Sequence, residues 1–262
     1  MKTTGTLELN PGIGNALAGL WTITWKSQFT WRLVWRTLLF VVFVPAFVLL
    51  TVQPGQASQY LRWALGFYLF LMLPLHCLVV FGPLIRDELQ ADTIGFLLTR
   101  PISRGRLFVL KFICQQCCVQ TAALASGLLL LASGLFARID DLGTLLPLLL
   151  IGQAMAVLVY GALGALMGLI SRKYMVLGVV YGFIVEWGIG SIPTNIHSLA
   201  MSHHVRGILA NSEIVANSYG DWVKADPLVA AGIMVAAAVI FLTVGAVLFT
   251  MREFHHSDEM QK

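Results

Sequence analysis

Six long apolar runs, separated by shorter polar stretches, dominate the pattern of hydrophobic positions along the chain. A helix needs about 20 mostly apolar residues to cross the hydrocarbon core of a bilayer. Proline and glycine inside such runs are tolerated where neighbouring helices satisfy the freed backbone groups. The pattern therefore predicts an all-α integral membrane protein with six transmembrane helices, at about residues 37–52, 63–81, 107–136, 145–170, 174–192 and 228–251.

Two segments outside these runs have a distinct character. Residues 16–36 contain four tryptophans, from Trp21 to Trp35, together with basic residues, which is typical of a helix lying in the headgroup region of a membrane. The alternative is a plain extension of the first span. Residues 193–227 are too polar to cross a bilayer, so we expect them to form a long connection outside it.

Composition excludes a water-soluble globular protein. Charged residues make up 11% and hydrophobic residues 58% of the 262 positions, whereas soluble domains have about 25% charged residues. Six spans leave no room for a separate soluble domain, so we expect one transmembrane domain over residues 1–262. The first residues lack a charged segment running into a short apolar one, so we do not expect a cleaved signal peptide.

The basic residues predict the orientation, because Lys and Arg concentrate on the cytoplasmic side of membrane proteins. With six spans, 13 of the 17 fall on the side of both termini, namely Lys2, Lys26, Arg32, Arg36, Arg86, Arg100, Arg104, Arg106, Lys111, Arg172, Lys173, Arg252 and Lys262. The acidic residues show no such bias. Both termini are therefore predicted to be cytoplasmic and residues 193–227 external. This distribution also explains the net charge of +4, so nucleic acid is not an expected partner.

The stretch from Gly82 to Lys111 is the one long charged interruption in the N-terminal half of the chain. After Pro83 the apolar positions recur at helical spacing, with most charged side chains off that face, which predicts a short amphipathic helix over residues 84–100. Pro101 disfavours helix at the residue before it, and Ser103 can cap the next helix, which is expected to begin near Arg104. Such a helix on the cytoplasmic face can convert a push from a soluble partner into a tilt of two spans.

The order of residues in this stretch resembles the permease subunits of type-2 ABC exporters. The resemblance rests on Glu88, the run Thr93–Leu98, the run Arg100–Arg106 and Lys111. It implies a coupling helix seated in a cleft of a cytoplasmic ATPase, two permeases enclosing an export path in a bacterial inner membrane, and short external helices within residues 193–227. The residues expected to dock on the ATPase are Arg86, Asp87, Glu88, Asp92, Gly95, Arg100, Pro101, Ser103 and Arg104.

The chain contains no G-x-x-x-x-G-K-[ST] sequence, so ATP and Mg²⁺ are expected on the partner ATPase and not on this chain. The charges of the central stretch could instead be mere orientation signals. A membrane scaffold that recruits a cytoplasmic partner without transport is a second alternative. An intramembrane enzyme is a third, although the sequence offers no H-E-x-x-H or G-x-S-x-G motif. The cargo, and whether two identical or two related permeases pair, stay open.

Polar residues inside predicted spans are candidates for lining a transport path, because such side chains usually face the interior of a helix bundle. These are Gln115, Gln116, Gln120 and Glu186. Glu186 has the alternative of simply reaching the outer interface. Cys114, Cys117 and Cys118 are expected to be packing residues rather than a soft-metal or redox site, and His203 and His204 are adjacent and make a poor zinc pair.

Glycines four residues apart, Gly164 with Gly168 and Gly178 with Gly182, permit close approach of helices. Packing within one subunit and packing between two copies explain these pairs equally well.

Overall fold

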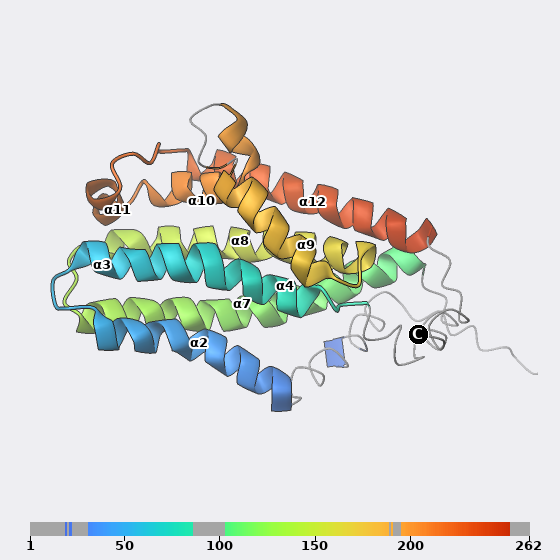
Figure 1. The fold of residues 1–262 in the computed structure, drawn as a ribbon, viewed down its shortest axis with the longest axis horizontal. Helices are drawn as coiled ribbons and strands as arrows, with labels where there is room; N and C mark the ends of the chain where they lie inside the picture. Colours follow the sequence, from blue (N-terminus) through green and yellow to red (C-terminus); the bar gives the residue numbers. More distant parts are fainter. Residues whose placement is uncertain are drawn as a thin grey trace, which may run out of the picture.

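The computed structural model describes residues 31–85, 103–188 and 195–251, together with residues 19, 21, 22 and 190. Helices account for most of the described chain (Figure 1). They are α2 (Trp31–Thr51), α3 (Ala57–Leu61), η1 (Arg62–Met72), α4 (Leu73–Phe81), α7 (Arg104–Phe136), α8 (Leu142–Ile170), α9 (Tyr174–Tyr181), η2 (Gly182–Gly188), η4 (Asn195–Leu199), α10 (Met201–Leu209), α11 (Glu213–Ser218) and α12 (Pro227–Met251).

Within the described residues, five helical stretches are long and apolar enough to cross a membrane. They are Val34–Thr51 of α2, the continuous α3–η1–α4 helix (Ala57–Phe81), α7, α8 and α12. These five correspond to predicted spans one to four and six. The predicted fifth span appears as a shorter apolar helix, Tyr174–Glu186, built from α9 and most of η2. The protein is therefore an all-helical, multi-pass membrane protein.

The helix boundaries differ from the prediction at two places. Residues 31–36 belong to α2 and continue straight into the first span, because no proline or glycine interrupts the chain before Pro45. This favours the extension of the first span over a separate interfacial helix for that part of residues 16–36. Most of residues 16–30 lies outside the described residues. At the other place, the helix that continues from α9 ends at Gly188, before the predicted Ile192.

The two ends of the bundle are identified by contacts between its turns. At one end, the N–H of Gly55 donates to the carbonyl oxygen of Ala137 at 3.0 Å, which joins the turn after α2 to the turn after α7. The Thr144 and Ser212 hydroxyls meet there at 3.0 Å, so α11 sits at the start of α8. The start of α2, the end of α4, the start of α7 and the end of α12 lie at the opposite end (Figure 1). This is the end that the basic residues predict to be cytoplasmic.

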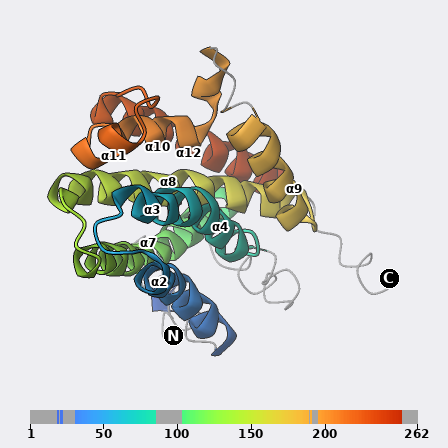
Figure 2. The same ribbon diagram turned by 60° about the vertical axis from the view of Figure 1, so that its left-hand side comes forward.

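The connection predicted to be external, residues 193–227, contains short helices of the kind that the family resemblance implied. η4, α10 and α11 fall within residues 195–218, and α10 packs on both α8 and α12. Figure 2 shows α10 and α11 gathered over one end of α8, while α9 leaves the bundle at the other end. One side of α10 is buried, including Val205, Ile208 and Leu209, because its apolar residues recur at helical spacing.

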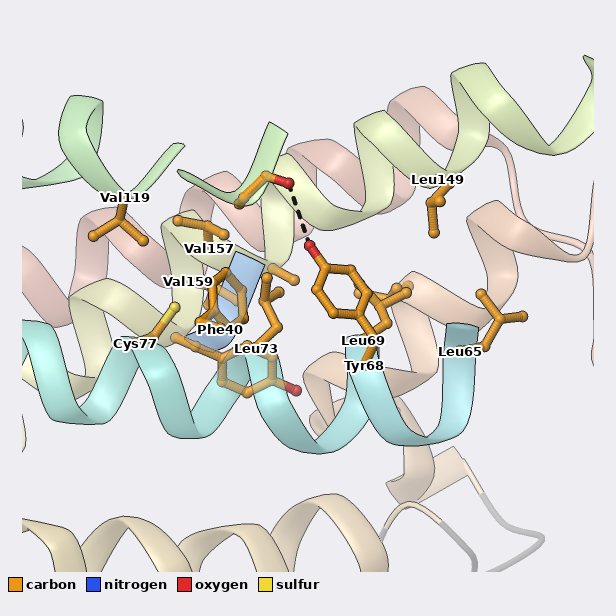
Figure 3. Close-up of a cluster of buried hydrophobic side chains, with 14 of the residues drawn as sticks. Phe40, Leu65, Tyr68, Leu69, Leu73, Cys77, Val119, Leu149, Val157 and Val159 are labelled. Atoms are coloured by element: carbon orange, nitrogen blue, oxygen red, sulfur yellow. Dashed lines mark hydrogen bonds between the residues drawn. The ribbon is translucent and has the colours of Figure 1, made fainter. Parts of the chain in front are cut away.

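α4, α7 and α8 pack around a core of apolar side chains with a few polar groups. Tyr68 lies among Leu65, Leu69 and Leu149 (Figure 3). Its hydroxyl is 3.3 Å from the carbonyl oxygen of Ala123 and 3.1 Å from Oε1 of Gln153, so it ties η1 to both α7 and α8. A buried hydroxyl needs such partners because no water reaches it.

Glycines allow α8 and α9 to pack closely against the end of α4, at the predicted cytoplasmic end of the bundle. A Cβ atom on Gly168 of α8 would collide with the backbone of Gly82, and one on Gly178 of α9 would collide with the side chain of Leu78. Gly164 lies close to the backbone of α4 as well, near Cys77 and Leu78. Packing within one subunit therefore accounts for three of the four paired glycines. Gly182 is the exception, since its Cβ would meet open space.

Candidate functional site

The predicted docking surface lies mostly outside the described residues, which resume at Ser103. This applies to Arg86, Asp87, Glu88, Asp92, Gly95, Arg100 and Pro101. Ser103 occupies the N-cap position of α7 with an extended backbone (φ −63°, ψ 142°), and Arg104 is the first helical residue, as predicted. The Ser103 hydroxyl makes no capping hydrogen bond within the described chain.

The segment that leads into the docking surface is firmly anchored. Residues 82–85 form a turn after α4, so the helix predicted from residue 84 does not begin there. Leu84 and Ile85 in this turn are buried in the main core, at 6% and 4% exposure. Gly82 contacts Gly168 and Tyr174, which sit on either side of the turn joining α8 to α9. The turn at residues 82–85 is therefore packed against the end of α8 and the start of α9.

A cavity of about 510 Å³ lies between η1, α4, α8, α9, η2 and α10. Its size falls within the range of small-molecule sites. Its walls are largely apolar, and its polar groups come from Tyr160, Tyr181, Glu186, Ser202 and Arg206. Two of the helices that line it, η1 and η2, are π-helical there. Departures from α-geometry of this kind are frequent at functional sites.

Glu186 lies on η2 and is bound to the start of α10. Its Oε2 accepts a hydrogen bond from the backbone N–H of Ser202 at 2.9 Å, and its Oε1 accepts one from the N–H of Met201 at 3.3 Å. Oε1 also accepts a hydrogen bond from the Tyr181 hydroxyl at 3.1 Å. The carboxylate thus satisfies backbone donors that every helix leaves free in its first turn, and the helix dipole favours a negative charge there.

Arg206 follows Ser202 by one helical turn and lines the same cavity. Its guanidinium carbon lies 5.2 Å from the centre of the Phe70 ring and 5.7 Å from the Trp222 ring. Trp222 is held in turn by stacking on Tyr219, with ring centres 4.6 Å apart. Cation–π contacts of this kind stabilise a partly desolvated guanidinium but use none of its N–H donors. Its Nε is buried and has no hydrogen-bond partner among the described residues.

The three glutamines predicted to line a path lie between helices instead of in the cavity with Glu186. Gln115 is buried on α7, at 5% exposure. Gln120 donates from Nε2 to the carbonyl oxygen of Ala154 on α8 at 2.9 Å. Both polar atoms of the Gln116 amide are buried without a described partner. The structure therefore brings only Glu186 of the four candidates to the cavity.

The cysteines are all free thiols, and Cys114 and Cys118 are buried while Cys117 is exposed. No group of three or more His, Cys, Asp or Glu side chains in the described residues is arranged to hold a metal ion. His204 Nε2 is 2.8 Å from the carbonyl oxygen of Ser198, which fixes its ring against η4. His76 stacks on Phe40 with ring centres 4.0 Å apart.

His203 points toward His197, with ring centres 4.1 Å apart. Burial first, and then the neighbouring His197, His204 and Arg206, lower the pKa of His203 from its ordinary value of 6.5 to about 4. The ring is therefore neutral at physiological pH, on the helix that carries Ser202 and Arg206.

Sequence reasoning missed Arg206 and its aromatic neighbours. In the sequence, Arg206 is one of the four basic residues outside the 13 assigned to the side of both termini, and its stretch is too polar to span. The amphipathic pattern of residues 201–209 was the available signal, since it places Ser202 and Arg206 one turn apart on one helix. The partners Phe70 and Trp222 lie far away in sequence, so no local pattern could identify them.

One protein-family model, described as ABC-2 family transporter protein, matches residues 26–188 of the chain. The matched region runs from the start of α2 to the end of η2, and it includes the central stretch that carries the predicted docking residues. No curated protein matches the sequence.

Proposed function

Since the chain belongs to the ABC-2 family of transporter proteins and is a membrane-spanning permease, we propose that it forms the export path of an ATP-driven ABC exporter and is driven by a separate ATPase subunit. The observation that carries this proposal is the family match over residues 26–188. That region contains the central stretch between α4 and α7. A permease of this family is a transport component, and hydrolysis of ATP takes place elsewhere.

The proposed partner is a cytoplasmic ABC ATPase that binds ATP and Mg²⁺ and docks on residues 84–100. The chain contains no phosphate-binding loop of its own. In this proposal, both termini and residues 84–100 face the cytoplasm of a bacterial inner membrane, and residues 193–227 face outward. The charge distribution supports this orientation, because the external end of the described bundle carries only Arg62, Arg138, Arg206 and Lys224.

Energy would enter by differential binding, since the coupling segment would fit one nucleotide state of the ATPase better than the other. The buried Leu84 and Ile85 and the contact between Gly82 and Gly168 support a stiff link from this segment into the bundle. Two permeases, either identical or related, would pair so that the cavities beside Glu186 and Arg206 form parts of the path. This chain itself makes and breaks no covalent bond.

The experiment is co-expression with a cytoplasmic ABC ATPase subunit from the same genome, followed by affinity purification through a tag on the permease. The expected result is a stable complex containing two permeases and two ATPases, whose hydrolysis of ATP differs from that of the ATPase alone. Export from inverted vesicles that requires ATP would separate a transporter from a scaffold. A permease that recovers no ATPase, with correct membrane insertion, would contradict the proposal.

A further inference from the structure

The two charged residues of the cavity differ in how they are neutralised. Both oxygens of Glu186 already accept hydrogen bonds from Tyr181, Met201 and Ser202, and the start of α10 adds its own positive dipole. This carboxylate therefore has little capacity left for a ligand. Arg206, by contrast, forms no ion pair or side-chain hydrogen bond with any described residue.

A buried N–H donor without a hydrogen-bond partner is costly, so the Nε of Arg206, which has none among the described residues, marks a place where a ligand can supply the missing partner. Phe70 and Trp222 hold the group in position while leaving its N–H donors available. The planar fork of Arg matches the oxygens of carboxylate and phosphate groups, and such charge-assisted pairs are about twice as strong as neutral hydrogen bonds.

The remaining walls of the cavity suit an apolar body. They include Leu75 and Leu163, together with Leu71, Val179 and Phe183, which are 46%, 40% and 62% exposed. These exposed side chains lie on the helices of the predicted second and fifth spans, so we expect the cavity to be reachable from the lipid. A ligand could therefore enter from the bilayer with its apolar part first in contact with Phe183 and Val179.

We propose that this cavity binds amphipathic anions, with a carboxylate or phosphate on Arg206 and the apolar body against the walls formed by η1, α4 and η2. This inference deepens the proposed function, because it names the cargo class of the exporter, and as cargo it rests on that function. The same chemistry is present in a bilayer lipid with an anionic headgroup. The experiment below separates the two sources.

The test measures retention of two probes with the same alkyl chain, dodecyl phosphate and dodecyltrimethylammonium, by native mass spectrometry of the permease alone in dodecyl maltoside. The wild-type protein is expected to retain the phosphate probe at least roughly tenfold more strongly than the ammonium probe. Equal retention of both probes would overturn the proposal. This comparison uses only the wild-type protein, so its result can be interpreted even if a substitution at Arg206 disturbs folding.

Three variants identify the site. Arg206→Gln is expected to weaken phosphate retention by roughly tenfold or more, and Arg206→Lys to weaken it less, because Lys keeps the charge but not the planar fork. Lys224→Gln removes an exposed cation of the same end outside the cavity and should leave retention unchanged. Unchanged retention in Arg206→Gln, or an equal loss in Lys224→Gln, would refute a site at Arg206.

Competition distinguishes the source of the anion. A cargo site is expected to prefer the single-chain phosphate over diacyl phosphatidic acid, whereas a lipid site would retain the diacyl lipid preferentially and through Arg206. The latter result would confirm anion binding and overturn the cargo role. Because the ATPase takes no part in this measurement, failure of the exporter proposal and failure of this inference give different results.

Discussion

The backbone N–H of Ser202 donates a hydrogen bond of 2.9 Å to Oε2 of Glu186, and this bond joins η2 to the first turn of α10. Glu186 lies within the predicted fifth span, whereas Ser202 belongs to the external connection, so the two are linked across a boundary that the sequence pattern separates. The carboxylate is consequently a structural acceptor at one edge of the cavity. Arg206, one turn further along α10, contacts Phe70 and Trp222, and its Nε has no hydrogen-bond partner in the part of the chain that the structure describes.

Glu186→Ala is expected to lower the stability of the folded protein by about 1–3 kcal/mol, because it removes a charged acceptor and leaves the N–H groups of Met201 and Ser202 unsatisfied. Glu186→Gln should lose less, since its amide oxygen can still accept one of these bonds. The measurement is the midpoint temperature of unfolding in dodecyl maltoside.

The control is Glu213→Ala, which removes an exposed carboxylate from the first turn of α11. Surface changes of this kind usually stay within about 0.5 kcal/mol, although a loss near 1 kcal/mol is possible at a helix start. A Glu186→Ala protein as stable as wild type would show that the bonds to α10 contribute nothing.

Gly168→Ala is expected to destabilise the junction of α4 and α8, because the added methyl group would collide with the carbonyl oxygen of Gly82. Overpacking of this kind costs about 1–3 kcal/mol, and relief requires the backbone to shift. Gly232→Ala on α12 is the matched control, since its Cβ meets nothing within 4 Å and alanine favours helix by about 0.5–1 kcal/mol.

Thermal unfolding of both variants in the same detergent is the direct measurement. The expected order is Gly232→Ala at or above wild type and Gly168→Ala clearly below it. If both alanines were tolerated equally, α4 and α8 would not be in backbone contact, and the stiff link from residue 85 into the bundle would lose its basis.

The sequence predicted the helical class and most of the spans, because apolar runs of this length have no alternative in a bilayer. The starts of α7 and α12 differ from their predicted positions by only a few residues. The described part of the fifth helix ends at Gly188, and the Gly190, Ser191 and Pro193 that follow are a local breaker signal that the prediction of a span to Ile192 did not use.

The cavity could be predicted only in part. Glu186 was identified because a carboxylate inside an apolar run is rare. Its partners on α10 and the role of Arg206 depend on how the external connection folds back over α8 and α12, which no periodicity encodes. The glutamines were expected to line a path for the same reason as Glu186, and this stays a prediction; Gln120 donates a hydrogen bond to the backbone of the neighbouring helix.

His203 is expected to make the protein less stable in acid. Its folded-state pKa of about 4 lies below the ordinary value of 6.5, so the unfolded chain binds a proton first as pH falls. The contribution of neutral His203 to the free energy of unfolding is complete above pH 6.5. It decreases as the pH falls from 6.5 and is lost once the pH has fallen through about 4. Because the ring is only partly buried, solvent screens the effect, and we expect a modest decrease in unfolding temperature.

His203→Gln removes the titrating group and should flatten the dependence on pH between 6.5 and 4. The comparison is the difference in unfolding temperature between variant and wild type at several pH values. This difference should change across that interval and be constant above it. A difference that does not vary with pH would show that His203 binds its proton equally well in the folded and unfolded states.

Reversal of the charge at Glu88 is expected to uncouple transport from hydrolysis while leaving insertion intact, if residues 84–100 dock on an ATPase. Glu88→Lys would place a cation where the docking proposal requires a carboxylate opposite a basic partner, and like charges juxtaposed in an interface cost several kcal/mol.

The matched control is Asp221→Lys, which makes the same change of charge at an exposed position of the connection predicted to be external. Recovery of the ATPase on the tagged permease and ATP-dependent export are measured for both variants. Normal recovery and export in Glu88→Lys would remove the central stretch from the coupling mechanism, whereas an equal defect in Asp221→Lys would point to a general effect of charge on assembly.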